Sequence, residues 1–540
     1  MSIKKVFDNN ILKIIKFIFF LFIIVKACLL DNNTHLIFWL LVEYSCISLV
    51  SSFIYDRNHV VGYIINFILL LIFGVQVIVL RFGGTYVLPI MITNLDSIQD
   101  IKGKSSIYIF YAVVLVLMLF VSPVSFKKLK KNIKKVLNVL LVCCLMVECF
   151  FVYTSDNSPL KSTVELVVDL YKGNKSYQEI QNSKKIDDEE FNELFYREGI
   201  DDCIESPFES KPDIVLIFTE GLSQSVIDDD RDIMPNVKEY ESKSINFTNY
   251  YNHTAATYRG LIGQLYSGYQ YNNHDENPLV SIQQILKDNG YETSFINVEP
   301  NNSDFSDYLG RLGFDEVITS GTNGEMLDDE AYSYLTDVVN EKVEHDEPQF
   351  IVIYTFGTHA SFDSNEYMFD DGSNRELNKF YNADHYFGEF MNVIESDDKF
   401  DNTLVCYTSD HSTYEDEDFI GAFEPEYTRD DWFCDRIPFF MYYKGIEGRT
   451  IDVNGRNSLS LAPTILDYVD IDAENYFLGK SLFMDYDEEY LLDKIYSISD
   501  TNYFKSTFNG NIEDLSEENE QRVTELVYKY FSHTISSTEE

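Results

Sequence analysis

Four residues that could bind a metal stand directly after apolar runs in the second half of the chain. Glu220 follows "DIVLIFT", His359 follows "FIVIYTFGT", and the pair Asp410-His411 follows "TLVCYTS". If the runs are buried parallel strands, their carboxyl ends meet at the edge of the sheet where such sheets bind ligands. Carboxylate oxygens and imidazole nitrogens together bind hard to borderline divalent metals. The sequence therefore predicts a divalent-metal site at this edge.

A candidate nucleophile lies in the segment "NYYNHTAATYRGLIGQLYSG", where two threonines precede an apolar helical stretch. Thr257 would lie near the helix N-terminus, whose N–H groups and dipole favour an anion and so assist alkoxide formation and phosphate binding. A metal held by Glu220, Asp410 and His411 would lower the pKa of a coordinated hydroxyl further. Thr254, three residues earlier, stays open as an alternative nucleophile.

Alternating strands and helices must position these residues. The apolar runs "YETSFINV" and "IPFFMYY" accompany the three runs above, and "SIQQILKDNG" and "DEAYSYLTDVVNEKV" are typical of helices. Buried strands that alternate with helices predict a mostly parallel sheet covered on both faces. We expect this α/β domain over residues 213–495, followed by an acidic C-terminal extension over residues 496–540.

The first 154 residues contain five apolar stretches of about the 20 residues that cross a bilayer core as a helix. The stretches repeat and brief polar loops separate them, which indicates membrane spans rather than a signal peptide. We expect a five-helix transmembrane domain over residues 1–154 and an amphipathic linker over residues 155–212. The predicted spans lie near Ile11–Leu30, His35–Tyr55, Val60–Leu80, Ser106–Val124 and Val136–Tyr153.

Basic residues predict the orientation of these spans. Lysines lie before and inside the first stretch, six more fill residues 127–135, and residues 31–34 have none. The third loop opposes this orientation, because it carries Arg81, Lys102 and Lys104 on the predicted outer side. The prediction is a multi-pass protein of the cell membrane with a cytoplasmic N-terminus and, after five crossings, an extracellular α/β domain.

Charge is distributed very unevenly along the 540 residues. Lys and Arg number 42 against 88 Asp and Glu, a formal charge of -46. Residues 1–160 have a balance of +7, and residues 161–540 have a balance of -53. So acidic a surface repels nucleic acid, and this excludes a DNA- or RNA-binding function. Three cysteines lie in the acidic part, and we expect Cys406 to be a buried core thiol.

The ordered motifs resemble the lipoteichoic acid synthase branch of the alkaline phosphatase/sulfatase superfamily. They are the strand ending at Glu220, "TYRGL" opening a helix followed by Ser267-Gly268, "TFGTHASF", "YTSDH" and "NSLSLAPTILDYVDI". The five predicted spans before an outward domain match that branch too. The resemblance therefore covers nearly the whole chain.

The resemblance implies a membrane-anchored metalloenzyme that transfers a phospholipid head group of the phosphoglycerol type. A threonine attacks the phosphodiester, diacylglycerol leaves, and the phosphoglycerol passes to a hydroxyl of an envelope glycan or glycolipid acceptor. Carried over by position, Glu220, Thr257, Asp410 and His411 match the metal shell. Thr257 also matches the nucleophile, and His359 matches a substrate-side histidine. The implied cofactor is one divalent metal, manganese first, with magnesium or zinc as alternatives.

The sequence departs from this pattern after "YETSF". The segment "INVEPNNSDFSDYLGRLGFDEV" lacks the Gly-Gly pair and the Trp/Arg head-group pocket expected of relatives that handle phosphoglycerol. Either Arg259 or Arg311 binds the phosphate instead, or the transferred group differs, as in a phosphoethanolamine transferase. The stretch "STYEDEDF" after His411 has no further histidine, so a two-metal site is not expected.

Two other function classes stay open. One is a sulfatase-like hydrolase, although residues 253–260 contain no C/S-x-P-x-R stretch. The other is a non-enzymatic scaffold or receptor. His253 and His274 are expected to be surface loop residues.

Overall fold

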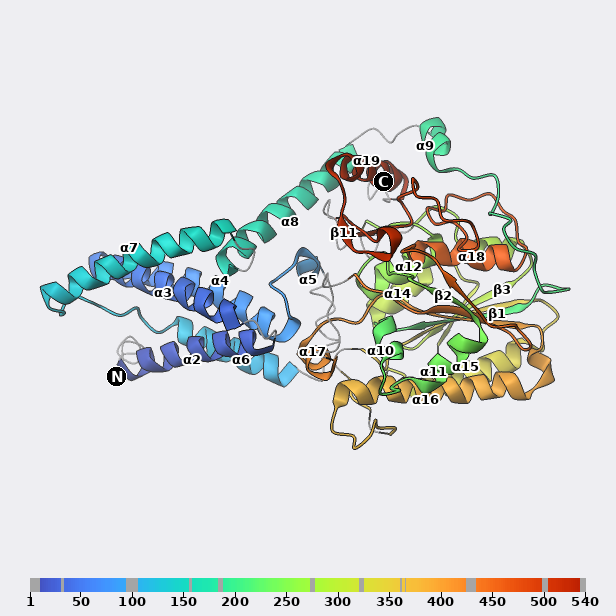
Figure 1. Cartoon of the computed structure of the whole chain (residues 1–540), viewed down its shortest axis with the longest axis horizontal. Helices are drawn as coiled ribbons and strands as arrows, with labels where there is room; N and C mark the ends of the chain where they lie inside the picture. Colours follow the sequence, from blue (N-terminus) through green and yellow to red (C-terminus); the bar gives the residue numbers. More distant parts are fainter. Residues whose placement is uncertain are drawn as a thin grey trace. The chain divides into compact units, whose positions relative to one another are not determined.

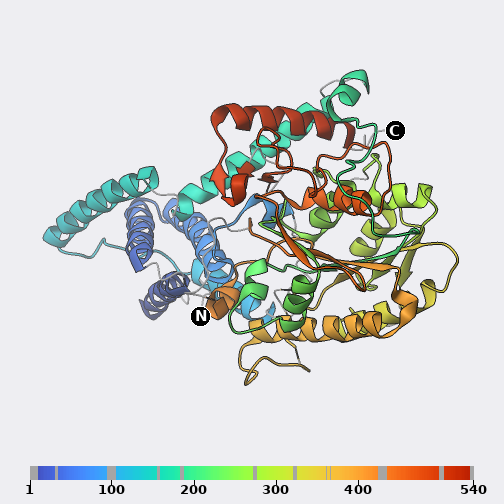
Figure 2. The same cartoon turned by 45° about the vertical axis from the view of Figure 1, so that its right-hand side comes forward.

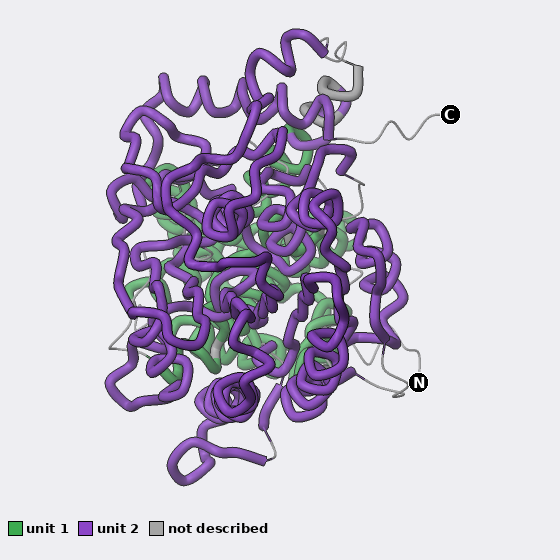
Figure 3. The backbone as a smooth tube through the Cα atoms, turned by 90° about the vertical axis from the view of Figure 1, so that its right-hand side faces the viewer, with its two compact units in different colours: residues 1–172, 415–424 green, residues 173–414, 425–540 purple. Residues whose placement is uncertain are grey.

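The structure is a computed structural model of the whole chain. It describes residues 10–30, 34–93, 105–154, 158–182, 188–271, 277–319, 325–359, 362–364, 366–423, 434–497 and 504–534. The chain divides into two compact units, coloured separately in Figure 3. The helical unit comprises residues 1–172 and 415–424, and the α/β unit comprises residues 173–414 and 425–540.

The helical unit has an apolar helix at each of the five predicted spans. Three are long and apolar enough to cross a membrane, namely His35–Arg57, His59–Gly83 and Lys131–Thr154. The two-part architecture is thereby confirmed, whereas five spans are not. The α6 helix has only 15 residues, about 22 Å of rise, and α2 carries three lysines. The helices are α2 (Asn10–Leu30), α3 (Thr34–Arg57), α4 (His59–Gly83), α5 (Pro89–Thr93), α6 (Ser105–Leu119), α7 (Lys131–Thr154) and α8 (Pro159–Asn182).

One short helix of the helical unit comes from the C-terminal half of the sequence. This helix, α17 (Glu417–Phe423), packs against α2 and α4. The Asp416 carboxylate caps its first turn by accepting the Asp418 and Phe419 N–H groups at 3.0 Å. Phe419 and Phe423 are buried. The chain therefore enters the helical unit at residue 415, only four residues after His411.

The α/β unit is built on an eight-stranded sheet in the order β4-β3-β5-β1-β6-β7-β2-β8. The first five strands of this order are parallel, β7 is antiparallel to both its neighbours, and β2 and β8 are parallel. The predicted mostly parallel sheet is confirmed. The strands are β1 (Asp213–Thr219), β2 (Ile245–Thr248), β3 (Glu292–Asn297), β4 (Glu316–Thr319), β5 (Gln349–Thr355), β6 (Thr403–Ser409), β7 (Phe439–Tyr442) and β8 (Arg449–Asp452).

Helices cover both faces of this sheet because its central strands are apolar on both sides. Every residue of β5 and β6 is buried. Figures 1 and 2 show α11, α15 and α16 on one face and α12 and α18 on the other. The helices are α10 (Gln224–Asp228), α11 (Pro235–Lys243), α12 (Thr257–Tyr266), α13 (Ile282–Asp288), α14 (Ser303–Arg311), α15 (Asp328–Lys342), α16 (Arg375–Ser396) and α18 (Leu461–Tyr468).

The described parts of the segment expected as an acidic extension (residues 496–540), namely residues 496–497 and 504–534, pack into the α/β unit. A three-stranded antiparallel sheet comprises β9 (Ile495–Ser497), β10 (Phe504–Ser506) and β11 (Glu513–Asp514). The helix α19 (Glu517–Thr534) buries Val523, Val527 and Tyr530 in an apolar cluster with α9 (Asp188–Phe195). The acidic residues of α19 therefore lie on one face of the helix, and its opposite face packs into the core.

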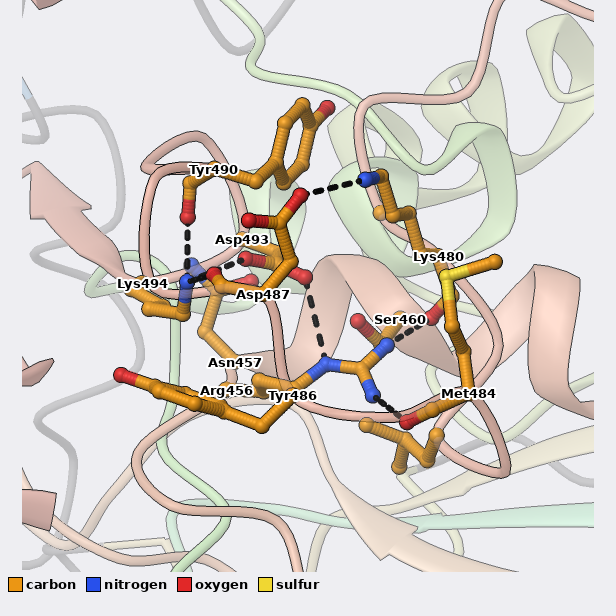
Figure 4. A network of polar contacts seen from close by, with 12 residues as sticks. Arg456, Asn457, Ser460, Lys480, Met484, Tyr486, Asp487, Tyr490, Asp493 and Lys494 are labelled. Atoms are coloured by element: carbon orange, nitrogen blue, oxygen red, sulfur yellow. Dashed lines mark hydrogen bonds and ion pairs between the residues drawn. The ribbon is translucent and has the colours of Figure 1, made fainter. Parts of the chain in front are cut away.

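A buried network around Arg456 fixes the segment between α18 and β9 (Figure 4). The Arg456 guanidinium donates to Asp493 Oδ2 at 3.2 Å and to the carbonyls of Lys480, Ser481 and Met484 at 2.6–3.2 Å. Lys494 donates to the carbonyls of Asp487 and Tyr490. A buried charge is tolerated when it is paired and hydrogen-bonded, and Arg456 meets both conditions.

Candidate active site

The sheet register brings the predicted site residues to one edge. Thr219 at the end of β1 pairs with Thr355 of β5 and with Ser409 of β6. Glu220 and Asp410, the residues that directly follow β1 and β6, therefore lie at the same level. The order of the strands explains why two sequence segments 190 residues apart meet there.

Glu220, Asp410 and His411 form one buried cluster. One ligand atom from each lies within 4.8 Å of the others, and within the described ranges this is the one such group of three. His411 Nε2 is 3.4 Å from Glu220 Oε1 and 3.4 Å from Asp410 Oδ2. The predicted convergence of these strand ends is found in the structure.

The donor set fits a divalent cation. His411 Nδ1 lies 2.7 Å from the Ser412 carbonyl, to which it can only donate, so in the neutral ring the Nε2 lone pair faces the two carboxylates. Asp410 Oδ2 and His411 Nε2 are buried and have no hydrogen-bond partner among the described residues. Unpaired buried polar atoms are costly, and a cation between them would remove that cost.

Hydrogen bonds hold the two carboxylates in place. Asp410 Oδ1 accepts the Gly221 N–H at 2.9 Å and the His411 N–H at 2.8 Å. Tyr354 donates its hydroxyl to Glu220 Oε2, and the Thr358 hydroxyl donates to the Glu220 carbonyl at 2.5 Å. These contacts leave Asp410 Oδ2 and Glu220 Oε1 facing the imidazole.

Electrostatics in the cluster reflect two buried carboxylates near one imidazole. Burial raises the pKa of Asp410, and the adjacent Glu220 charge raises it further, to about 7. Burial opposes the charge of His411, yet the Asp410 and Glu220 charges outweigh it and raise this pKa to about 9. Burial likewise opposes ionisation of Glu220, but the His411 charge holds this pKa below its usual value. The site therefore attracts positive charge strongly.

Thr257 is the threonine that faces the cluster. It is the first residue of α12, and its hydroxyl donates to Glu220 Oε2 at 3.1 Å. The Thr254 hydroxyl instead donates to the Ser497 carbonyl at 2.8 Å, where residues 254 and 497 form a parallel bridge. The geometry thus separates two threonines that the sequence leaves as alternatives.

The start of α12 is shaped for close approach to this cluster. Its N-cap is Ala256, which has φ 74° and a methyl group that cannot accept a hydrogen bond from the first turn. A Cβ on Gly260 would lie 2.3 Å from the Asp410 carbonyl oxygen, so only glycine allows this spacing. The Gln264 amide donates to the Ser409 and Asp410 carbonyls at 2.9 and 3.2 Å and ties α12 to the end of β6.

His359 lies close enough to the cluster for its charge to help lower the Glu220 pKa. Its half-buried ring packs 4.9 Å from Phe356, centroid to centroid. Arg259, the third residue of α12, is buried, and Arg311 is exposed at the end of α14. The substrate-binding roles of His359 and of either arginine stay predictions.

One histidine expectation is wrong. His253, expected in a surface loop, is 1% exposed, and its Nδ1 lies 2.6 Å from the Ser458 hydroxyl. Burial lowers the pKa of His253 to about 3, so the ring is neutral. The polar neighbours of His253 in the sequence hide the fact that residues 253 and 254 cross the core between Ser458 and Ser497. His274 lies outside the described residues.

Sequence reasoning missed four supporting residues, namely Tyr354, Thr358, Gly260 and Gln264. Tyr354 is at the penultimate position of β5, one of the strands whose carboxyl ends are predicted to form the site. Reading the last residues inside each strand, as well as those after it, would have found it. Gln264 and Gly260 face Asp410 from successive turns of α12. Their spacing of four residues is common in helices, and it points to a site only once Asp410 is known to lie opposite.

A mixed α/β sheet with a buried carboxylate and imidazole cluster beside a threonine at a helix N-terminus defines a domain suited to metal-assisted phosphoryl or sulfuryl transfer. Residues 212–471 match the family model of the sulfatases. Members of the sulfatase and alkaline phosphatase superfamily use a divalent metal. The cluster of Glu220, Asp410 and His411 is the candidate site for such a metal in this protein.

Solved structures share the fold, and two of them are similar over about two thirds of this chain. One is a protein of the alkaline phosphatase superfamily from Vibrio parahaemolyticus, with 16% identity and a TM-score of 0.51 over 68% of this chain and 98% of that one. The other is the lipoteichoic acid synthase LtaP from Listeria monocytogenes, with 13% identity and a TM-score of 0.51 over 65% and 99%. No curated protein sequence matches the chain. The domain match and these two structures support the α/β fold that the resemblance implied.

Proposed function

We propose that this protein is a membrane-anchored, metal-dependent transferase that moves a phosphoglycerol-type head group from a phospholipid to an envelope glycan or glycolipid. The observation that carries the proposal is the 3.1 Å hydrogen bond from the Thr257 hydroxyl to Glu220, inside the buried cluster with Asp410 and His411. A nucleophile whose hydroxyl shares a carboxylate with a cation site is suited to phosphoryl transfer.

The residues present define two displacement steps. Thr257 Oγ attacks the donor phosphorus, the bond from phosphorus to the diacylglycerol oxygen breaks, and diacylglycerol leaves with a proton. An acceptor hydroxyl then attacks the phosphothreonine, the bond to Thr257 Oγ breaks, and that oxygen regains a proton. His359 at the rim is the candidate proton donor to the leaving oxygen.

The N-terminus of α12 favours an anionic group beside Thr257. The first turn of α12 begins at Thr257, where a helix dipole and N–H groups favour a phosphate. When bound by Glu220, Asp410, His411 and Thr257, a divalent cation, manganese first, would neutralise phosphoryl oxygens and lower the pKa of the hydroxyl. Glu220 orients the Thr257 hydroxyl whether or not a cation is bound.

The proposed setting is the outer face of a cell membrane. The apolar helices and the lysines near the N-terminus support a cytoplasmic N-terminus and an extracellular α/β domain. Cysteine accessibility tests this: a membrane-impermeant maleimide on intact cells should label the exposed Cys203. Labelling of Cys203 only after the cells are opened would contradict the proposed orientation.

The decisive experiment is the mass of the Thr257 adduct. Full-length protein with manganese and phosphatidylglycerol should release diacylglycerol and gain one phosphoglycerol on Thr257. Thr257→Ala should reduce diacylglycerol release at least about 1,000-fold, as loss of a covalent nucleophile does. Thr254→Ala is the matched control because its hydroxyl bonds the Ser497 carbonyl, and it should keep the adduct. A folded Thr257→Ala variant with undiminished release would refute the proposal.

A further inference from the structure

Two glutamates lie inside apolar helices of the helical unit. Glu43 is the tenth residue of α3, and Glu148 is the eighteenth residue of α7. Both helices are long and apolar enough to cross a membrane, and they pack side by side (Figure 1). A carboxylate is rare in such a helix because a charge inside a membrane is costly. Each of these glutamates therefore needs a partner.

Glu43 and Glu148 are buried, and each is the other's neighbour. Glu43 is fully buried, and Glu148 is 9% exposed. Their side chains lie within hydrogen-bonding distance of each other. Two ionised carboxylates cannot make such a bond, because neither has a proton to donate and their charges repel. The contact therefore requires a proton or another cation.

No basic residue supplies this positive charge. Neither glutamate forms an ion pair with a lysine, arginine or histidine in the part of the chain that the structure describes. Lys16, a buried cation of the same unit, donates instead to Asn66 Oδ1 at 3.3 Å and to the Val121 carbonyl at 3.0 Å. The other ionisable neighbours of the pair are the thiols of Cys46 in α3 and Cys144 in α7, which carry no positive charge.

Glu43 is the member of the pair that keeps its negative charge. Its Oε2 accepts the Ser158 hydroxyl at 2.8 Å, and its Oε1 accepts the Leu160 N–H at 3.0 Å. Ser158 directly precedes α8, and Leu160 lies in the first turn of that helix. The dipole and the free N–H groups of a helix N-terminus stabilise an anion. Glu43 is therefore a carboxylate that caps α8 from a different helix.

Glu148 is the member of the pair that holds the proton. No N–H or O–H donor of the described residues reaches either of its buried carboxyl oxygens. As a carboxylate, Glu148 would be a buried charge without compensation. As a carboxylic acid it is neutral, and its O–H can donate to Glu43. This assignment gives the Glu43 carboxylate three donors and gives the Glu148 proton an acceptor.

A proton suits this pair better than a metal ion does. A metal ion needs several ligand atoms that converge, and among the described residues three such atoms converge within 4.8 Å only at the Glu220 cluster. A shared proton needs two oxygens, and the two carboxyl groups supply them.

We propose that Glu43 and Glu148 form an intramembrane proton-binding site, in which a proton held by Glu148 and shared with Glu43 fastens the start of α8 to the helical unit. Release of the proton leaves two adjacent carboxylates, and their repulsion weakens the hold of Glu43 on Ser158 and Leu160. The first turn of α8 then opens. Because α8 carries the chain from the helical unit into the α/β unit after residue 172, this proton controls the first turn of the connection.

N,N′-Dicyclohexylcarbodiimide locates the proton, because this apolar reagent reacts with a protonated carboxyl group and not with a carboxylate. Full-length protein in detergent at about pH 7 should gain one adduct in the helical unit, on Glu148, by mass spectrometry. Glu148→Gln should lose the adduct. Asp56→Asn is the matched control and should keep it, because Asp56 of α3 accepts the Ser125 hydroxyl at 2.6 Å and the Phe126 N–H at 3.0 Å. An unmodified Glu148, or protection of Glu148 by sodium or calcium, would overturn the proton site.

Hydrogen exchange tests whether the proton fastens α8. Raising the pH until the Glu148 adduct no longer forms should increase the opening of the first turn of α8 at least about tenfold, after correction for the chemical exchange rate. In Glu148→Gln the amide donates to Glu43 at every pH, so the opening should stay constant. Glu165→Gln should behave as the wild type, because Glu165 is an exposed residue of α8 that pairs with Lys161 at 3.6 Å.

The results also separate this proposal from the transferase, because neither measurement uses a lipid donor or manganese. Equal opening of α8 at both pH values in the wild type, or the same rise in Glu148→Gln, would overturn the role of the proton. An adduct on Glu148 that still forms fully at about pH 10 would overturn it too. Loss of the Thr257 adduct alone would leave the proton site unaffected.

Discussion

Replacing Gly260 with alanine tests whether α12 positions Thr257 against the metal cluster. The added Cβ would lie 2.3 Å from the Asp410 carbonyl oxygen and 2.9 Å from its carbon. Ordinary contact begins at 3.4 Å, so the helix or the loop must move by about 1 Å. The Asp410 carbonyl yields little because Gln264 donates to it at 3.2 Å, and we expect α12 to shift outward.

Two opposing effects set the size of the change. Alanine is favoured over glycine inside a helix by about 1 kcal/mol, whereas overpacking a tight contact costs about 1–3 kcal/mol. We therefore expect Gly260→Ala to lower the free energy of unfolding by about 0–2 kcal/mol. Activity should fall much further, because a displacement of about 1 Å at a reacting group costs on the order of 100-fold in rate.

Gly310→Ala supplies the matched control. Gly310 lies in α14, and its Cβ would meet no atom within 4 Å, so this variant should gain stability by up to about 1 kcal/mol. Thermal unfolding, manganese affinity by calorimetry and diacylglycerol release should be measured on both variants. Gly260→Ala with wild-type manganese affinity and wild-type release would refute the positioning role of this contact.

Three further perturbations follow from buried charge. Manganese at 1,000 times its dissociation constant should stabilise the protein by about 4 kcal/mol in thermal unfolding, and a chelator should reverse the shift; equal melting with and without metal would contradict the site. Burial raises the pKa of Glu241 from 4.5 to about 7, so the native state keeps a proton that the unfolded chain loses. This proton adds about 3 kcal/mol to the free energy of unfolding below pH 4.5, and the stabilisation is lost as pH rises through 7. Glu241→Gln should therefore flatten the pH profile of unfolding between pH 4.5 and 7. An unchanged slope would contradict the role of Glu241. Arg456→Met removes the cation from the buried Asp493 and should cost about 3 kcal/mol in denaturant unfolding, whereas Lys505→Met breaks an exposed pair and should cost under about 1 kcal/mol; equal costs would refute the assigned role of Arg456.

Local patterns predicted the central sheet well because its strands carry their burial in their own composition. The runs before Glu220, His359 and Asp410 are apolar on both faces, and each is a strand of the parallel part. The strand β8 was not predicted. Three of its four residues are exposed or polar at the sheet edge, so neither alternation nor apolar content marks it.

The site could be predicted as far as it depends on strand ends, and no further. The choice between Thr254 and Thr257 depends on Ser497, which lies 243 residues away from Thr254. The burial of His253 depends on Ser458, also distant in sequence. Both are tertiary contacts made by polar side chains, and polarity alone suggests a surface loop in each case.

Residues 415–424 have a practical consequence for fragments of this protein. A piece that begins after α8 keeps the α/β unit but also keeps α17, whose packing partners α2 and α4 it has lost. Phe419 and Phe423 would then be exposed to solvent and form an apolar patch that favours self-association. Because Asp410 and His411 lie only a few residues before α17, aggregation through α17 would disturb these candidate metal ligands. Weak metal binding by such a fragment would therefore report on truncation, and α17 needs polar replacements at Phe419 and Phe423 before the fragment is assayed.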